Sequence, residues 1–278
     1  MMRSMLLLSL LLFTAVTAQA APLILGGARP AKLYAPSQST SGEAVPLIVF
    51  LHGYGVTGAQ VNFQFNSASS ANALGYAALI PDGQPDRNGR NFWNATPECC
   101  NFYGSERDDV AYLVSLIEEA KRTLRISNVT LFGHSNGGFM AHRMACERPD
   151  LLKGIVSVAG GFFKDPSLCK NPGPLTVLQI HGTADRTIPY AMNSGYPGAV
   201  ESVQNWAELL DCKTTRSVAQ AEDLITFSLG GVPGGKETDA LEFADCSGGA
   251  KVSLWTVNGG QHVNVFNNLV KKAMTFQN

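Results

Sequence analysis

The stretch Phe132–Gly138 reads FGHSNGG and places Ser135 between Gly133 and Gly137. The apolar run Val129–Phe132 leads into it, which indicates a buried strand, and a helical pattern follows it. A serine in the pattern G-x-S-x-G at a strand-to-helix turn is typical of a nucleophile. Side chains beside it would clash with the neighbouring strand and helix, which explains the glycines. We therefore predict that Ser135 is raised above a sheet edge, with the N–H groups of a helix N-terminus behind it.

Apolar runs alternate with helical patterns along the chain, an order typical of a mainly parallel sheet covered by helices, and so of an α/β fold. The clearest amphipathic helix is DDVAYLVSLIEEAKRTL over Asp108–Leu124, with Asp108 as its N-cap. Two runs, Asp82–Arg107 and Asp211–Ala250, are predicted to be irregular insertions, and long loops of this kind are often functional. The predicted strands are Leu47–Leu51, Ala77–Ile80, Val129–Phe132, Gly154–Val158, Thr176–Ile180 and Val252–Val257.

A serine nucleophile needs a base, and the base needs an acid that orients it. In the G-x-S-x-G arrangement the acid and then the base follow the serine along the chain, each in a loop after a strand. Asp185 lies in HGTAD after the strand Thr176–Ile180, and His262 lies in GGQH after the last strand. The sequence therefore predicts a triad of Ser135, Asp185 and His262.

Four other histidines and one further aspartate compete for these roles. His134 is expected to point to the other side of the turn, and His142 to be a surface or packing residue of the following helix. His52 and His181 each precede a glycine at a strand end, where a ring usually braces the loop backbone. Asp165, after the preceding strand, is the runner-up for the acid, although a single aspartate in a loop is often only a turn-former.

The run HGYG at positions 52–55 follows the first buried strand. In this kind of site a backbone N–H group from that loop meets the N–H group of the residue after the nucleophile. We therefore predict that the N–H groups of Tyr54 and Asn136 form an oxyanion hole. A Gly-rich turn without this role is the alternative.

The first twenty residues, MMRSMLLLSLLLFTAVTAQA, combine a basic residue at Arg3, an apolar stretch over Met5–Val16 and an Ala-Gln-Ala site at the end. This pattern is typical of a secretory signal peptide. The alternative is a membrane anchor, but the apolar stretch is shorter than the roughly 20 residues that a spanning helix needs. We predict a signal peptide over 1–20, a single catalytic domain over 21–278, and a secreted protein in the extracellular space or periplasm.

All six cysteines follow the predicted cleavage site, as expected of a protein from an oxidising compartment. A bridge between Cys212 and Cys246 would close the second insertion, and Cys146 with Cys169 is a further candidate pair. Cys99 and Cys100 are adjacent. A bridge between neighbours strains the peptide, so two separate thiols are the alternative there.

The composition excludes several classes of protein. Of 278 residues, 45% are hydrophobic and 15% charged, as in a globular domain, and the formal net charge is −1 without any run of Lys or Arg. These values argue against a nucleic-acid partner and favour neutral or apolar ligands, with no membrane partner for the mature chain. Neither a metal site nor a CxxC redox site is expected, because the only close cysteines have no spacer.

Several motifs occur together in a specific order: LHGYG, PDG, FWNATPECC, DDV, GHSNGG, HGTAD followed by Ile188-Pro189-Tyr190, and GGQH. This set resembles the secreted α/β-hydrolases grouped as polyhydroxybutyrate depolymerase-like esterases, close to feruloyl and acetyl xylan esterases. The resemblance covers Leu47–His262. It implies an α/β-hydrolase fold with a mainly parallel central sheet flanked by helices, no cofactor, and the triad roles argued above.

The resemblance also implies a serine ester hydrolase that forms an acyl-enzyme. Esters or oligomers of 3-hydroxybutyrate are the expected substrates, and feruloyl or acetyl esters of plant cell-wall polysaccharides are the alternative. Trp93, Asn94 and Tyr190 are expected to line the substrate site, although Trp93 could instead anchor a loop. The protein is expected to be a monomer. An inactive hydrolase fold used as a binding module, and a peptidase with the same triad order, are the competing classes.

Overall fold

The computed structural model describes residues 21–170, 172–227 and 235–278. The predicted signal peptide over 1–20 lies outside the described residues, so it stays a prediction. Within the described ranges, no helix has the length and apolar character needed to cross a membrane.

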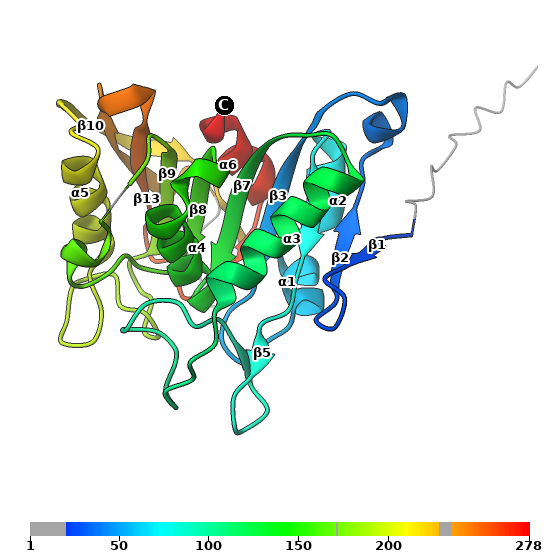
Figure 1. Cartoon of the computed structure of the whole chain (residues 1–278). Coiled ribbons are helices and arrows are strands. Elements are labelled where there is room, and N and C mark those ends of the chain that lie inside the picture. Colours follow the sequence, from blue (N-terminus) through cyan, green and yellow to red (C-terminus); the bar gives the residue numbers. More distant parts are fainter. Residues whose placement is uncertain (1–20, 171, 228–234) are drawn as a thin grey trace, which may run out of the picture.

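A ten-stranded sheet forms the centre of the protein, with the strand order β1-β2-β4-β3-β7-β8-β9-β13-β12-β10 (Figure 1). The six central strands pair in parallel, and they are the six strands predicted from the apolar runs. Their carboxyl ends therefore meet at one edge of the sheet, the lower edge in Figure 1. They are β4 (Ala77–Ile80), β3 (Val45–Leu51), β7 (Ile126–His134), β8 (Gly154–Val158), β9 (Thr176–Gly182) and β13 (Lys251–Val257).

Two antiparallel strands extend the sheet at each side: β1 (Leu23–Leu25) with β2 (Ala31–Tyr34), and β12 (Thr238–Ala244) with β10 (Thr214–Glu222). The expectation that Asp211–Ala250 is irregular is therefore wrong, because much of it joins the sheet. The edge strand β10 is largely exposed and reads TTRSVAQAE, so it lacks the apolar run that marks a buried parallel strand.

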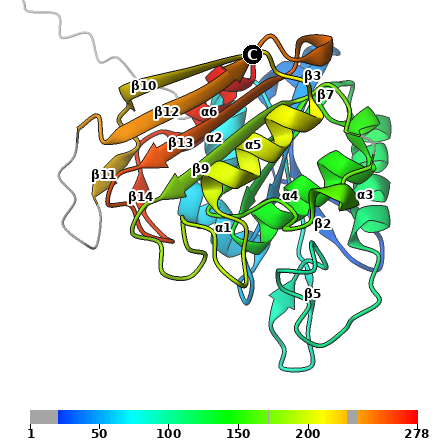
Figure 2. The same cartoon turned by 90° about the vertical axis from the view of Figure 1, so that its left-hand side faces the viewer.

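Helices cover both faces of the sheet, which confirms the predicted layers (Figure 2). One face packs against α3 (Asp109–Thr123), α4 (Asn136–Glu147) and α5 (Ala199–Leu209). The other face packs against α1 (Gly58–Phe65), α2 (Ser67–Ala73) and α6 (Leu269–Gln277). Each face has its own apolar core, because alternate residues of a strand point to opposite sides.

The helix predicted over Asp108–Leu124 is α3, and its predicted N-cap is confirmed. The side chain of Asp108 accepts a hydrogen bond from the N–H group of Ala111 at 2.8 Å. Val110, Leu113 and Ile117 are buried against the sheet, as the helical spacing of apolar residues indicates.

The remaining elements are short. Two small antiparallel pairs lie outside the main sheet, β5 (Gln84–Pro85) with β6 (Asn91–Phe92) and β11 (Ile225–Phe227) with β14 (Val265–Phe266). The first pair belongs to the predicted insertion 82–107, which lies below the carboxyl ends of the strands in Figure 1. Single 3-10 turns occur at Ser37–Ser41, Pro149–Leu151, Pro166–Leu168 and Ser247–Gly249.

Three disulfides use all six cysteines. Cys212 is bonded to Cys246 and Cys146 to Cys169, as predicted. Cys99 is bonded to its neighbour Cys100, so the alternative of two separate thiols is not what the structure contains. The bridge between Cys212 and Cys246 ties the end of α5 to the turn between β12 and β13.

Replacing both Cys212 and Cys246 by alanine is expected to lower the free energy of unfolding by about 4 kcal/mol, because the bridge joins residues 34 positions apart and restricts the unfolded chain. The matched replacement of Cys146 and Cys169, 23 positions apart, is expected to cost about 3 kcal/mol. Urea denaturation of both variants measures these values. A loss below about 1 kcal/mol for the longer loop would contradict the chain-entropy argument.

Candidate active site

Ser135 occupies a strained turn between β7 and α4. Its φ of 54° and ψ of −120° place a non-glycine residue in a region that L-amino acids rarely adopt. The turn is held by its backbone. The N–H group of Ser135 donates to the carbonyl of Val158 at 2.8 Å, and the carbonyl of Ser135 accepts from the N–H groups of Gly138 and Phe139. The serine therefore sits at the carboxyl edge of the sheet, directly before a helix N-terminus.

The glycines of the motif are required by close approach. A Cβ atom at Gly133 would lie 2.0 Å from the carbonyl oxygen of Gly137, and a Cβ atom at Gly137 would lie 2.2 Å from that of Leu51. These oxygens belong to the backbone and cannot move aside. The turn thus packs against itself and against β3 without room for a methyl group.

Asp185 and His262 are brought together by two neighbouring parallel strands. Asp185 follows β9, and His262 follows β13, which pairs with β9 in parallel. Nδ1 of His262 lies 2.8 Å from Oδ2 of Asp185. The other carboxylate oxygen accepts hydrogen bonds from the N–H groups of Thr187 and Ile188 at 2.8 and 2.9 Å. The aspartate is therefore fixed by the backbone of its own turn.

The pKa of Asp185 lies below its ordinary range. Burial by itself would raise this pKa, but hydrogen bonds from His181 and His262 outweigh the burial and lower it. The carboxyl group is therefore ionised at neutral pH. It accepts a hydrogen bond from the Nδ1–H group of His262, which leaves Nε2 of that ring free to bind a proton.

His134 lies against His262, contrary to the expectation that it points to the other side of the turn. Its Nε2 is 3.0 Å from the carbonyl oxygen of His262, and the two ring centroids are 5.1 Å apart. Because a carbonyl only accepts, the Nε2–H group of His134 is the donor. The residue before Ser135 thus holds the loop that carries His262.

In the described parts of the chain, Oγ of Ser135 has no hydrogen-bond partner.

The predicted oxyanion-hole segment approaches the serine closely. A Cβ atom at Gly53 would lie 3.3 Å from Cβ of Ser135, so the loop after β3 passes beside the turn. Asn136 is the first residue of α4, and its N–H group has no partner within the helix. Neither this N–H group nor that of Tyr54 makes a backbone hydrogen bond within the described residues. Both groups therefore remain available to an oxyanion.

The first insertion is tied to the serine turn by paired amide contacts. The side chain of Asn136 accepts from the N–H group of Trp93 at 2.7 Å and donates to the carbonyl of Trp93 at 3.0 Å. The indole of Trp93 donates to the carbonyl of His52 at 3.0 Å and is fully buried. Trp93 is therefore a core residue that anchors the loop. The expectation that it lines the substrate site is not met, because none of its surface is accessible.

Asn94 also stabilises the first insertion through hydrogen bonds. Its side-chain amide donates to the carbonyl groups of Ser105 and Arg107, and its backbone N–H group donates to Asp109 at 2.8 Å.

Tyr190 is half-buried, with its hydroxyl 2.8 Å from that of Thr256. The side chain of Asp165 accepts from the N–H group of Ser167 and caps a short 3-10 turn, so the runner-up acid acts as a turn-former.

One partly buried ion pair next to the first insertion is not indicated by any sequence pattern. Nη1 of Arg29 lies 2.7 Å from Oδ1 of Asp109, and the side chain of Asp109 is fully buried. The other carboxylate oxygen accepts from the N–H group of Asn94. Arg29 and Asp109 are 80 positions apart, so no local pattern relates them. This pair joins the segment between β1 and β2, the start of α3 and the first insertion.

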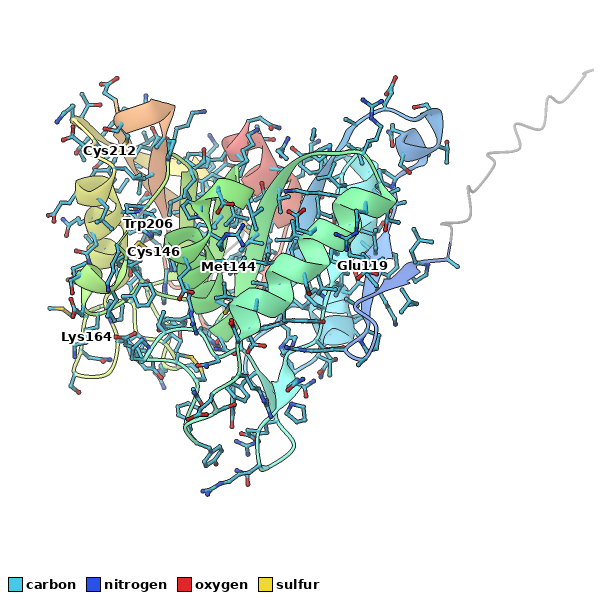
Figure 3. All side chains as sticks on the ribbon, viewed as in Figure 1. Glu119, Met144, Cys146, Lys164, Trp206 and Cys212 are labelled. Carbon is cyan, nitrogen blue, oxygen red and sulfur yellow. A yellow bond between two sulfur atoms is a disulfide. The ribbon has the colours of Figure 1, made fainter. Side chains whose placement is uncertain are left out.

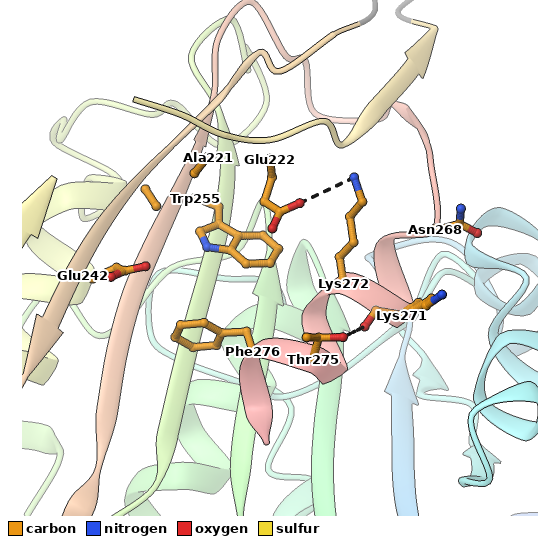
Figure 4. Close-up of a pocket in the computed structure, with 10 residues that line it drawn as sticks. Ala221, Glu222, Glu242, Trp255, Asn268, Lys271, Lys272, Thr275 and Phe276 are labelled. Carbon is orange, nitrogen blue, oxygen red and sulfur yellow. Dashed lines mark hydrogen bonds and ion pairs between the residues drawn. The ribbon is translucent and has the colours of Figure 1, made fainter. Parts of the chain in front are cut away.

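Figure 4 shows a cavity that is separate from the predicted site residues. It measures about 360 Å³ and lies between strands β10, β12 and β13 and helix α6. Trp255 and Phe276 meet there edge to face with ring centroids 5.9 Å apart. Lys272 forms an ion pair with Glu222 at 3.6 Å. None of the predicted site residues lines this cavity.

Comparison with known proteins relates the chain to ester hydrolases. Residues 107–223 match the phospholipase/carboxylesterase family. The protein named "Putative esterase NocK" of Nocardia uniformis subsp. tsuyamanensis is 28% identical over 254 residues, which are 86% of this chain and 71% of that protein. Feruloyl esterase B of Piromyces equi is 27% identical over 245 residues, which are 82% of this chain. The chain spans only 41% of the length of that second relative.

A solved structure shows the same fold. The acetyl xylan esterase from Aspergillus awamori superposes with a TM-score of 0.65 at 15% identity, over 89% of this chain and 93% of that structure. An S-formylglutathione hydrolase from Agrobacterium tumefaciens gives a TM-score of 0.53 at 14% identity, over 89% of this chain and 86% of that structure. The α/β-hydrolase fold expected from the sequence is thereby confirmed.

The free energy of unfolding is expected to fall as the pH decreases from 6.5 towards 4. Burial lowers the pKa of both His134 and His142 from 6.5 to about 4, so between these values the unfolded chain binds protons that the folded chain does not. Each such proton contributes a slope of at most about 1.4 kcal/mol per pH unit. Urea denaturation at pH 7, 5.5 and 4.5 measures the slope, and His142→Gln should reduce it. Equal stability at all three pH values would refute the expectation.

Proposed function

We propose that this chain, which is an ester hydrolase with the α/β-hydrolase fold, cleaves carboxylic esters through an acyl-enzyme on Ser135, with His262 as base and Asp185 as the orienting acid. One observation carries the proposal. An ionised, backbone-anchored carboxylate lies 2.8 Å from the ring of His262, and that histidine is held by the residue directly before a serine in a strained turn.

In the first half of the reaction, Oγ of Ser135 attacks the ester carbonyl carbon while Nε2 of His262 takes the hydroxyl proton. Asp185 stabilises the imidazolium that forms and keeps its Nδ1–H group directed at Oδ2. The tetrahedral intermediate collapses when the C–O bond to the alcohol breaks. The departing alkoxide takes the proton from His262, and the acyl group stays on the serine.

The negative charge on the carbonyl oxygen develops next to the N-terminus of α4. Two N–H groups, those of Tyr54 and Asn136, are proposed to bind this oxyanion. The helix dipole adds a partial positive charge at the same place. Asn136 is kept in position by the two contacts between its side chain and the backbone of Trp93, so its N–H group does not depend on a mobile loop.

Deacylation repeats these steps with water as the nucleophile. His262 removes a proton from water, which attacks the acyl carbon, and Oγ of Ser135 leaves as the proton returns to it. The products are a carboxylic acid and the free enzyme. No step requires a redox change or a phosphoryl group.

The proposed substrates are feruloyl or acetyl esters of plant cell-wall polysaccharides. This class is favoured because feruloyl esterase B and the acetyl xylan esterase, whose names state a substrate, are of this kind. Esters of 3-hydroxybutyrate, which the motif resemblance favours, are the second candidate. Both are neutral esters, in agreement with a chain of formal net charge −1.

We further propose that the enzyme is exported and acts as a monomer on its ester substrate. The three disulfides support an oxidising compartment, because such bridges persist outside the cytosol. The signal-peptide pattern at 1–20 points to the same compartment.

Replacing Ser135 by alanine is expected to lower kcat for p-nitrophenyl butyrate by about 10³-fold or more, since no other nucleophile lies in the turn. Asp185→Asn should lower kcat by a similar factor because the ring of His262 loses its orienting carboxylate. Asp165→Asn is the matched control and should leave kcat unchanged, since Asp165 only caps a turn. Full activity of Ser135→Ala would reject the proposed nucleophile and favour a binding module.

The substrate class is tested with the wild-type enzyme on methyl ferulate, acetylated xylan, a 3-hydroxybutyrate trimer and a peptide anilide. We expect kcat/KM to be highest for one of the two wall esters, and the anilide to remain intact. A preference for the trimer over both wall esters would instead select the hydroxyalkanoate class. Cleavage of the anilide would support the peptidase alternative.

A further inference from the structure

A row of polar side chains crosses the apolar core between the sheet and the helices α4 and α5. Gln179 and His181 point from β9 to this face, His142 comes from α4, and Trp206 comes from α5 (Figure 3 labels Trp206). None of these four side chains is accessible beyond 2% of its surface. We call these four residues the buried polar chain.

Hydrogen bonds connect the members of the buried polar chain in sequence. Nε1 of Trp206 donates to Nδ1 of His142 at 2.9 Å, and Nε2 of His142 lies 3.1 Å from Oε1 of Gln179. Nε2 of Gln179 lies 3.1 Å from Nδ1 of His181. The series therefore runs without interruption from α5 to the turn that carries Asp185.

The direction of every bond follows from the chemistry of the ends. An indole N–H group can only donate, so Nδ1 of His142 must accept and its proton sits on Nε2. That Nε2–H group then donates to Oε1 of Gln179. The amide nitrogen of Gln179 donates to the carbonyl of Gly160 at 2.9 Å and to Nδ1 of His181. Each group is used in the only role that its neighbours leave open.

The opposite end leads to the same assignment independently. The carbonyl of Ile188 can only accept, and Nε2 of His181 lies 2.8 Å from it. The proton of His181 therefore sits on Nε2, and its Nδ1 is an acceptor, as the other end of the series requires. Burial lowers the pKa of His142 to about 4, so that ring is neutral at pH 7. Reversal of any one member would set two acceptors or two donors against each other.

The last member touches the acid of the proposed triad. Nε2 of His181 lies 3.5 Å from Oδ2 of Asp185, the same oxygen that faces His262. Its hydrogen bond to Ile188 also fixes the residue whose N–H group binds the other oxygen of Asp185. The orientation of the His181 ring thus acts on both carboxylate oxygens, one directly and one through the backbone.

We infer that the buried polar chain positions the carboxylate of Asp185 for His262, so that its members are positioning residues for the reaction although none of the four contacts the serine or the base and only His181 contacts the acid. The inference rests on the proposed function, since it requires Asp185 to be the orienting acid.

The burial of these groups favours this role over simple packing. Burying amide and imidazole groups costs free energy that hydrogen bonds only offset, and apolar residues of similar volume would fill the same space without that cost. A fully satisfied polar series, in contrast, admits one orientation of each ring and amide. That single orientation is what an acid aimed at one ring nitrogen needs.

His142 is the best position to test because it is remote from Asp185 and offers a conservative replacement. Glutamine at this position can accept from Trp206 and donate to Gln179, so His142→Gln keeps the direction of the series. Leucine can do neither. We expect His142→Leu to lower kcat for p-nitrophenyl butyrate about tenfold with KM changed less than about twofold. His142→Gln should restore kcat to within about twofold of the wild type.

Phe162→Leu provides the control for packing. Phe162 is fully buried and contacts the rings of His142 and Trp206, but its side chain takes no part in the series. It should lower the melting temperature and leave kcat unchanged when activity is measured well below that temperature. If His142→Leu does not fold, Trp206→Phe removes only the terminal donor and should lower kcat by about threefold. The inference is overturned if His142→Leu has the same kcat as the wild type. Where His142→Leu does not fold, the same kcat for Trp206→Phe and the wild type overturns it.

Failure of this inference and failure of the proposed function are distinguishable. If Asp185→Asn keeps full activity, the proposed triad is wrong, whatever the result at position 142. If Asp185→Asn is inactive and His142→Leu keeps the kcat of the wild type, only the positioning role is rejected. If His142→Gln and His142→Leu lose kcat equally, the loss does not follow the hydrogen bonds, and the positioning role is rejected as well.

Discussion

The site depends on a steric constraint, the close approach of the serine turn to the neighbouring strand. With no side chain at Gly137, the start of α4 comes so near to β3 that an added Cβ atom would lie 2.2 Å from the carbonyl oxygen of Leu51. This approach forces Ser135 into its positive φ and places the loop at Gly53 beside it. The packing of the strand against the helix holds the turn in this strained conformation.

Electrostatics at this edge are organised by one ionised carboxylate. Asp185 lies in a buried place that would by itself favour the neutral acid, and it is ionised because backbone N–H groups and two histidines donate to it. One of these histidines, His181, in turn forms hydrogen bonds with the buried side chain of Gln179 and with the carbonyl group of Ile188. A series of hydrogen bonds therefore connects this carboxylate with polar groups in the middle of the apolar core.

The first insertion is bound to the site as firmly as the sheet is. Trp93 is anchored through its indole to His52 and through its backbone to Asn136, and the N–H group of Asn94 donates to a buried carboxylate at Asp109. Together these contacts make a long loop part of the rigid edge. Aromatic residues that look exposed in the sequence of such a loop can thus be structural, because the loop folds back onto the core.

Local pattern determined much of this protein. The apolar runs indicate all six parallel strands, and the cap at Asp108 marks the start of α3. Ser135, Asp185 and His262 each follow a parallel strand, which puts them at one edge of the sheet. These features follow from periodicity and from the geometry of parallel sheets, which are properties of short segments. Only the tertiary structure decided that polar strands such as β10 join the sheet, that Trp93 is buried and that His134 contacts His262. Each of these contacts joins parts of the chain far apart in the sequence, and the free energy of such contacts comes from neighbours that no local pattern records.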